Sequence, residues 1–125
     1  MIVFTSLFTL FILMIVIFQL SLALGAPLGH LSMGGKYPGK YPKKMRLIAL
    51  INILVLGLVE GIMLIRSGLI LDDLFKISQI AIWFVVAFFV LGSLMNLASP
   101  SKWERILWAP VNLVLLGLSL MVALS

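Results

Sequence analysis

Residues 25–46, GAPLGHLSMGGKYPGKYPKKMR, decide the organisation of this chain, because they form the only long interruption in an otherwise apolar sequence. They hold five of the nine Lys and Arg residues, the only histidine, five of the ten glycines and three of the five prolines. Prolines and paired glycines disfavour regular helix and favour turns. The segment therefore predicts a basic loop between long apolar segments.

The composition indicates that lipid is the solvent of this protein. Its 125 residues are 63% hydrophobic and 10% charged, with a mean hydropathy of +1.28, whereas soluble domains are about 45–50% apolar and about 25% charged. The lack of cysteine excludes disulfides and thiolate metal sites. The net charge of +5 favours contact with anionic lipid headgroups over nucleic acid, since anionic leaflets attract basic segments at about 1 kcal/mol per residue.

Four segments are long and apolar enough to span a bilayer, since about 20 helical residues cross a hydrocarbon core about 30 Å thick. The spans are expected at about residues 2–24, 47–65, 77–97 and 105–124. Barrel strands would need alternating polarity, which is absent. Mostly short links imply antiparallel neighbours. The sequence predicts one all-α domain, 1–125, built as a four-transmembrane-helix antiparallel bundle.

A cleaved signal peptide is the alternative interpretation of residues 2–24, because small residues follow the run. Signal peptides carry a basic segment before a shorter apolar core. No Lys or Arg precedes this run, so we favour a membrane span.

The distribution of Lys and Arg predicts the orientation, because these residues accumulate in short cytoplasmic loops. The second link carries only Arg66 and Lys76. The first and third links carry seven basic residues: Lys36, Lys40, Lys43, Lys44, Arg46, Lys102 and Arg105. We expect a multi-pass protein of the cell membrane, with the 25–46 loop cytoplasmic and both termini extracytoplasmic.

The turn before the fourth span carries a helix start signal. Pro100 ends the third helix, and Ser101 is a suitable N-cap residue. Glu104 follows three residues later, so the pair predicts a capping box at the start of the fourth helix.

The chain resembles a family of small, uncharacterised bacterial four-helix integral membrane proteins. One matching stretch is the GAP-x-G segment after the first helix, with a glycine pair and a proline shortly before a basic residue. Its residues here are Gly25, Ala26, Pro27, Gly29, Gly34, Gly35, Pro42 and Arg46. The other is NLASPSKWERILWAP, matched at Asn96, Ser99, Ser101, Glu104, Arg105, Trp108 and Pro110. The resemblance implies architecture and a bacterial inner membrane, and no activity.

Glu60 is the one carboxyl group inside an expected span. An ionisable group there costs at least about 2.5–3.5 kcal/mol, and such residues mark ion pathways, proton relays or paired positions. At helical rise it lies about 9 Å from the outer boundary marked by Arg66. We expect it to face the bundle interior, with Thr9, Gln79 or Ser119 as partner, and favour a structural role over coupling.

Gly57 and Gly61 flank Glu60 with the spacing G-x-x-x-G, which lets another backbone approach closely. We expect close helix packing beside Glu60, in preference to a specific dimer face.

Asn52 and Asn112 are expected at matched depth, about 9–10 Å below the cytoplasmic boundary. Amides on two helices can hydrogen-bond across them for about 0.6 kcal/mol. Pro110 also frees the carbonyl of Ile106 nearby. We therefore predict that the second and fourth helices are neighbours joined by this pair. The alternative is that each amide bonds to its own helix backbone.

Residues of the basic loop are candidates for contact with lipid headgroups. A flexible juxtamembrane linker is the favoured interpretation, and a nest of backbone N–H groups for phosphate is the alternative. The candidates are Gly34, Gly35, Lys36, Lys40, Lys43, Lys44 and Arg46.

No catalytic set is recognisable, because His30 is expected on the cytoplasmic loop and Glu60 near the opposite face. Ligands for a metal are too few, and no cofactor is expected. We therefore expect a non-enzymatic membrane component that binds a partner or lipid. Its partners would be the bilayer, anionic headgroups and a second copy or another membrane protein. A proton- or cation-coupled transporter using Glu60 is the alternative, and a lipid-modifying enzyme is the third hypothesis.

Overall fold

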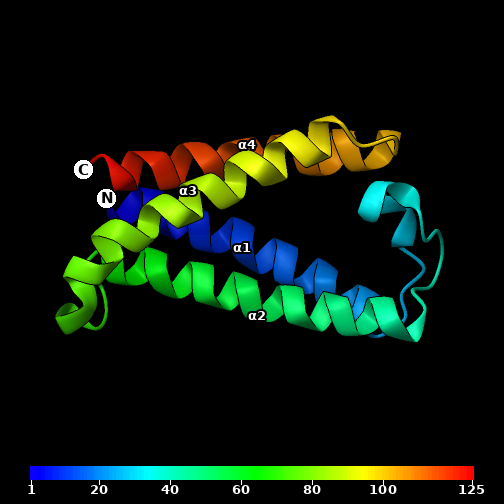
Figure 1. Ribbon diagram of the computed structural model, residues 1–125, viewed down its shortest axis with the longest axis horizontal. Helices are drawn as coiled ribbons and strands as arrows, with labels where there is room; N and C mark the ends of the chain where they lie inside the picture. Colours follow the sequence, from blue (N-terminus) through cyan, green and yellow to red (C-terminus); the bar gives the residue numbers. More distant parts are fainter.

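The computed structural model describes all 125 residues and is an all-helical, antiparallel four-helix bundle (Figure 1). The helices are α1 (Ile2–Ala23), α2 (Lys43–Arg66), α3 (Phe75–Leu97) and α4 (Lys102–Ala123). All four are long and apolar enough to cross a membrane. Both termini lie at one end, and the loop between α1 and α2 lies at the other. The predicted fold class is confirmed.

The helices extend beyond the spans predicted from hydropathy. α2 begins at Lys43 rather than residue 47, and α4 begins at Lys102 rather than residue 105. Pro42 precedes α2 in an extended conformation, as expected of a residue that cannot donate a helical hydrogen bond. The difference arises because hydropathy marks only the apolar part of a helix, whereas its backbone bonds continue through the charged interfacial turn.

The helices follow one another around the bundle in chain order. α1 packs beside α2 and α4, and α3 packs beside α2 and α4, whereas α2 and α4 lie on a diagonal with only slight contact. The prediction that the second and fourth helices are neighbours is therefore wrong. Consecutive helices joined by short links lie side by side, so the second and fourth members of a ring occupy opposite corners.

The main core occupies the middle of the bundle and the end that carries the termini. The rings of Phe8 on α1 and Phe89 on α3 meet edge to face there, with centroids 5.7 Å apart. A smaller cluster packs the loop end of α1 and α2 against their own loop; it consists of Leu22, Tyr41, Met45 and Ala49. α2 therefore leaves α3 and α4 towards the loop end, as Figure 1 shows.

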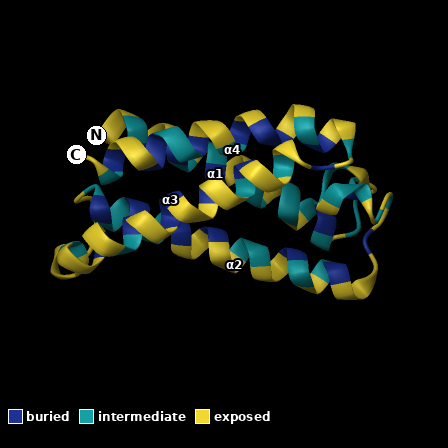
Figure 2. Ribbon diagram, turned by 45° about the horizontal axis from the view of Figure 1, so that its top comes forward, coloured by how far each residue is buried: buried dark blue, intermediate teal, exposed yellow.

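The outer faces of the helices carry large apolar side chains, which suits contact with lipid tails. Leu54 on α2 is 74% exposed and Phe84 on α3 is 72% exposed. Figure 2 shows exposed residues along the outer surfaces of all four helices. No layer of charged side chains shields these faces, in keeping with the composition.

The basic loop is folded and is not the flexible linker that the sequence favoured. It contains two 3-10 turns, η1 (Gly29–Leu31) and η2 (Met33–Gly35). The backbone N–H of Gly29 donates to Gly39 O at 2.9 Å, which closes the loop on itself. Gly29 is buried, and a β-carbon there would lie 1.8 Å from Tyr37 O. Only glycine fits this position.

Candidate functional site

The loop docks onto the turn between α3 and α4, which brings together the two stretches that carried the sequence resemblance. Ser101 Oγ donates to His30 O at 2.7 Å. Glu104 Oε2 accepts from Gly34 N at 2.9 Å, across 70 residues of sequence. Glu104 is buried, so this contact fastens the loop at its centre.

The predicted capping box forms only in part. Ser101 Oγ accepts from Glu104 N at 3.3 Å, as an N-cap residue should. The backbone N–H of Ser101, however, donates to Ser99 Oγ at 3.2 Å. The Glu104 carboxylate is thereby released from the cap and serves the loop instead.

The glycine pair does not form an open nest for phosphate. Gly34 N is already bonded to Glu104, and Gly35 N donates to Ser32 O at 2.9 Å. Both residues have positive φ and lie against Pro100 or Ser101 of the docked turn. Gly34 and Gly35 therefore shape and anchor the loop, and their expected role as headgroup ligands is corrected.

The basic residues of the loop divide into an inner and an outer set. Arg46 points inwards: its Nε donates to Tyr41 O at 2.9 Å, and its guanidinium borders Gly25. Through Nε it holds the end of the loop to the first turn of α2. The four lysines, in contrast, have exposed side chains: Lys36, Lys40, Lys43 and Lys44.

Tyr41 stands between Lys40 and the start of α2 and is only 3% exposed. Burial of its phenol raises the pKa of Tyr41 above the usual value. The ring also meets Tyr37 edge to face, with centroids 6.1 Å apart. The structure therefore places Tyr41 in the wall of the folded loop.

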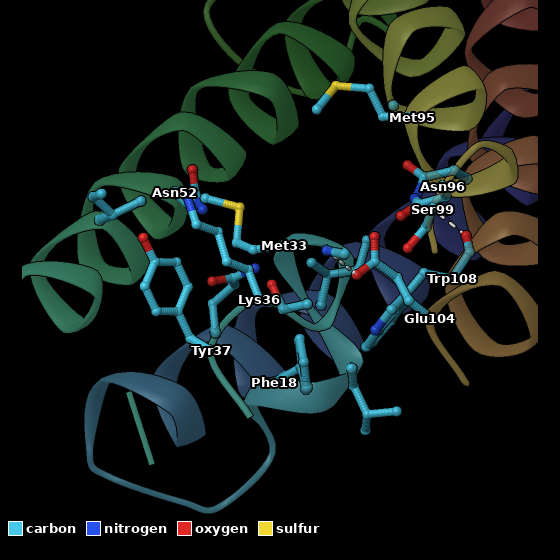
Figure 3. Close-up of a pocket in the computed structure, with 18 of the residues that line it drawn as sticks. Phe18, Met33, Lys36, Tyr37, Asn52, Met95, Asn96, Ser99, Glu104 and Trp108 are labelled. Carbon is cyan, nitrogen blue, oxygen red and sulfur yellow. Dashed lines mark hydrogen bonds between the residues drawn. The ribbon is translucent and has the colours of Figure 1, made fainter. Parts of the chain in front are cut away.

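A cleft of about 800 Å³ opens between α2 and α3 where these helices diverge. In Figure 3, Asn52 on α2 lies across the opening from Met95 and Asn96 on α3, and residues of the loop form the floor. α1 and α4 complete the lining with Phe18 and Trp108, whose rings lie 4.7 Å apart. The volume falls within the range of about 300–1,000 Å³ typical of small-molecule sites.

The lining of the cleft changes from apolar to polar towards the loop. Side chains such as Leu56, Phe88 and Phe89 line its inner part. Lys36 and Lys44 line the loop end, together with the Glu104 carboxylate. Amide side chains occur along the wall: Gln19, Asn52, Asn96 and Asn112. The cleft is therefore amphipathic along its length.

Asn52 and Asn112 both line this cleft, but they do not hydrogen-bond to each other. Asn112 Nδ2 donates to Trp108 O of its own helix at 3.1 Å, and its Oδ1 faces Gly92. The side chain of Asn52 has no hydrogen-bond partner within the chain, although its backbone lies in the regular helix α2. For Asn112 the alternative of bonding to its own helix is correct, and the predicted pair is absent.

Trp108 belongs to the second matching stretch, but the sequence did not identify it as a site residue. Its side chain lines the cleft, is only 8% exposed, and leaves the indole N–H without an acceptor. Buried indole N–H groups usually have a partner. The spacing of Trp108 and Asn112, one helical turn apart, was the available signal for a shared face of α4.

Glu60 lies outside the cleft, between α1 and α2 and nearer the end that carries the termini. Its Oε1 is hydrogen-bonded to Thr9 Oγ1, one of the three predicted partners. Gln79 is exposed on α3 beside Trp83 and Phe84, so it does not join Glu60. Ser119 donates instead to Leu116 O.

Gly57 and Gly61 do not form the expected close helix contact within the bundle. A β-carbon at either position would meet nothing within 4 Å. The expectation is wrong for this chain because these glycines lie on a part of α2 that no other helix covers.

The fold and the cleft together define a class: small multi-pass four-helix proteins with an amphipathic cleft near one end of the bundle. No family model matches the chain, and neither the curated proteins nor the solved structures contain a significant match.

Proposed function

We propose that this protein is a non-enzymatic membrane component that binds a lipid with an anionic headgroup in the cleft between α2 and α3. The observation that carries the proposal is the layout of that cleft. The cleft has a volume of about 800 Å³, walls that are mainly apolar, and a basic rim formed by Lys36 and Lys44. The acyl chains would lie against the apolar walls, and the headgroup would lie at the loop end.

The charge at the rim supports an anionic headgroup. Lys36 and Lys44 are exposed at the rim, whereas Glu104 is buried and already accepts from Gly34 N. The lysines are therefore available to a ligand, and the carboxylate is committed to the loop. Each lysine near the membrane surface contributes about 1 kcal/mol towards anionic lipid.

The unsatisfied polar groups of the cleft support a ligand that carries hydrogen-bond acceptors below its headgroup. The buried Trp108 N–H has no acceptor, and the half-buried Asn52 amide also lines the cleft. The ester carbonyls of a glycerolipid would supply acceptors at this depth. Leaving a buried donor unpaired costs about 1–3 kcal/mol, so satisfying it favours the bound state.

We further propose that the cleft end faces the cytoplasm of a bacterial cell and that both termini lie outside. This rests on the seven-to-two distribution of Lys and Arg between the two ends. Lys40→Cys labelling tests it, since Lys40 is exposed in the loop and avoids the positive φ of the neighbouring Gly39. Rapid modification in intact cells by an impermeant thiol reagent would contradict the orientation.

A binding experiment can test the lipid proposal directly. Trp83→Phe and Trp103→Phe leave Trp108 as the only tryptophan, and nanodiscs of phosphatidylcholine are supplemented with chain-brominated phosphatidylglycerol, a quencher. We expect stronger quenching of Trp108 than with brominated phosphatidylcholine. Loss of Lys36 and Lys44, at about 1 kcal/mol each, should lower the apparent affinity about 30-fold.

The matched control removes the same number of positive charges from the loop, but at positions outside the cleft. Lys40→Gln with Lys43→Gln removes two exposed lysines that do not line the cleft, and it should leave the preference for anionic lipid nearly intact. Lys36→Gln with Lys44→Gln should abolish that preference. Equal loss in both double variants would show nonspecific attraction and would refute a built site.

The alternative, a proton- or cation-coupled transporter, would place Glu60 on a ligand pathway. Glu60 does not line the cleft, so this function gains no support from the geometry of the site.

A further inference from the structure

Thr9 on α1 and Glu60 on α2 are joined by a hydrogen bond, and the surrounding contacts indicate which of the two groups donates the proton. Thr9 Oγ1 lies 2.9 Å from Thr5 O, its partner one helical turn back. The same oxygen is hydrogen-bonded to Glu60 Oε1. The other carboxyl oxygen, Glu60 Oε2, is buried and has no partner.

One hydroxyl proton cannot serve both contacts. A threonine hydroxyl carries a single O–H donor and two acceptor lone pairs, and an ionised carboxylate only accepts. When the Thr9 proton goes to Thr5 O, the bond to Glu60 needs a proton from the carboxyl group. Thr9 then donates to its own helix and accepts from Glu60.

The unpartnered Oε2 supports the same assignment. A carboxylate carries its charge on both oxygens, and burying a charge without pairing costs far more than burying a neutral polar group. The carbonyl oxygen of a neutral carboxylic acid tolerates the lack of a donor better. Glu60 therefore fits this position with its proton bound.

No cation faces Glu60 to hold it in the charged form. α1 presents Thr5 and Thr9 there and has no charged side chain. Arg66, six residues further along α2 and thus about 9 Å away, donates to Ser125 O and lies over the Phe75 ring, 5.5 Å from its centroid.

The two chain termini lie at this end of the bundle too, and the remaining charged side chains there lie on the link to α3 and its first turn. Asp72, Asp73 and Lys76 are all exposed there. No ion pair within the chain therefore balances a charge on Glu60.

We propose that Glu60 is a proton-binding site: a neutral carboxylic acid that donates to Thr9 Oγ1 and so joins α1 to α2. The site is separate from the lipid cleft, and it holds whether or not the cleft binds lipid. It also gives Glu60 a role in the bundle that needs no transported ion.

Infrared spectroscopy of the protein in phosphatidylcholine nanodiscs at neutral pH tests this assignment. The difference spectrum between wild type and Glu60→Gln should show loss of a carboxylic acid C=O band. That band should shift on transfer to deuterium oxide. Glu104→Gln is the matched control, because a carboxylate that accepts from Gly34 N should contribute no such band.

Two further variants keep the test decisive if Glu60→Gln folds poorly. Thr9→Ser keeps the hydroxyl acceptor and should leave the band unchanged. Thr9→Val removes the acceptor and should move the band to higher frequency. A wild-type spectrum without a carboxylic acid band, or a band that is unchanged in Glu60→Gln and Thr9→Val, would overturn the proposal.

Discussion

Gly29→Ala should undock the 25–46 loop while leaving the four helices in place. The new β-carbon would lie 1.8 Å from Tyr37 O and 2.8 Å from Gly39 O. Both are backbone atoms, so the clash cannot be relieved by a side-chain rotation. The loop must move, and the 2.9 Å bond from Gly29 N to Gly39 O must break or lengthen.

The magnitude follows from these contacts. Overpacking costs about 1–3 kcal/mol, and the lost hydrogen bond adds about 0.5–1.5 kcal/mol, for a total of about 1.5–4.5 kcal/mol. The loop is fastened to α4 mainly through Gly34 and Ser101, so this cost is comparable with its docking energy. Amide exchange in the loop should accelerate about ten- to thousandfold.

Hydrogen–deuterium exchange of the loop peptides, measured by mass spectrometry in nanodiscs, checks this prediction. Gly57→Ala is the matched control, because a β-carbon there meets nothing within 4 Å, and its loop should exchange as in the wild type. If Gly29→Ala exchanges within about twofold of the wild type, less than the acceleration of about tenfold expected for the smallest estimated cost, the reasoning from close contact is refuted.

Three further changes test other parts of the structure. Ser101→Ala removes the cap of α4 and the bond to the loop and should lower the free energy of unfolding by about 1–2 kcal/mol, measured by denaturant titration. Asn52→Leu and Asn112→Leu should have stability effects that add within about 0.5 kcal/mol, because no hydrogen bond joins them; a larger coupling would contradict this. Burial raises the pKa of Tyr41, so its stabilising contribution is present below about pH 10 and lost as the pH rises further. Tyr41→Phe should remove that alkaline loss in unfolding midpoints, and an unchanged loss would exclude Tyr41 as its source.

The membrane explains why the architecture was predictable. A helix is the only way for an isolated apolar segment to satisfy its backbone in lipid, so length and hydropathy located all four helices. Depth was predictable too, because helical rise is constant. Helical rise predicts that Glu60 and Thr9 lie at similar depth in the membrane, and the structure confirms their contact.

Rotation about the helix axis was not predictable from depth. Asn52 and Asn112 lie at similar depth, yet their helices occupy opposite corners of the ring. The predicted contact between Gln79 and Glu60 is absent because Gln79 lies on a different face of α3. The adjacent residue Ser78 is buried, and so is Ile82 one turn on, whereas Gln79 is turned away and exposed. Which face of a helix meets a neighbour depends on packing that single positions do not reveal.

The fold of the loop could not be predicted from its own sequence, because it depends on residues far away in the chain. Its proline and glycine content correctly predicted an interruption of helix, but composition does not show what a loop docks against. The contacts that fix it come from Ser101 and Glu104, about seventy residues away. The capping signal identifies both residues, but a cap gives no sign of the loop that the same side chains also bind.

The same loop explains why the bundle has a cleft. At the end that carries the termini, α1 and α2 are joined by Thr5 and Ser67, whose hydroxyls lie 2.6 Å apart, and all four helices share the main core. At the other end, α1 and α2 pack on their own loop, so α2 is drawn away from α3. The docked loop then supplies the floor of the opening and places Lys36 at its rim.

If the cleft binds anionic lipid as proposed, loop docking and lipid preference depend on each other. Lys36 lies seven residues after Gly29 in the same folded segment, so undocking the loop removes Lys36 from the rim without changing its charge. Gly29→Ala should therefore reduce the preference for anionic lipid as Lys36→Gln does, although the net charge stays at +5. Attraction by charge alone would leave Gly29→Ala with wild-type preference. A parallel loss in both variants would instead show that position, and not charge alone, makes the site.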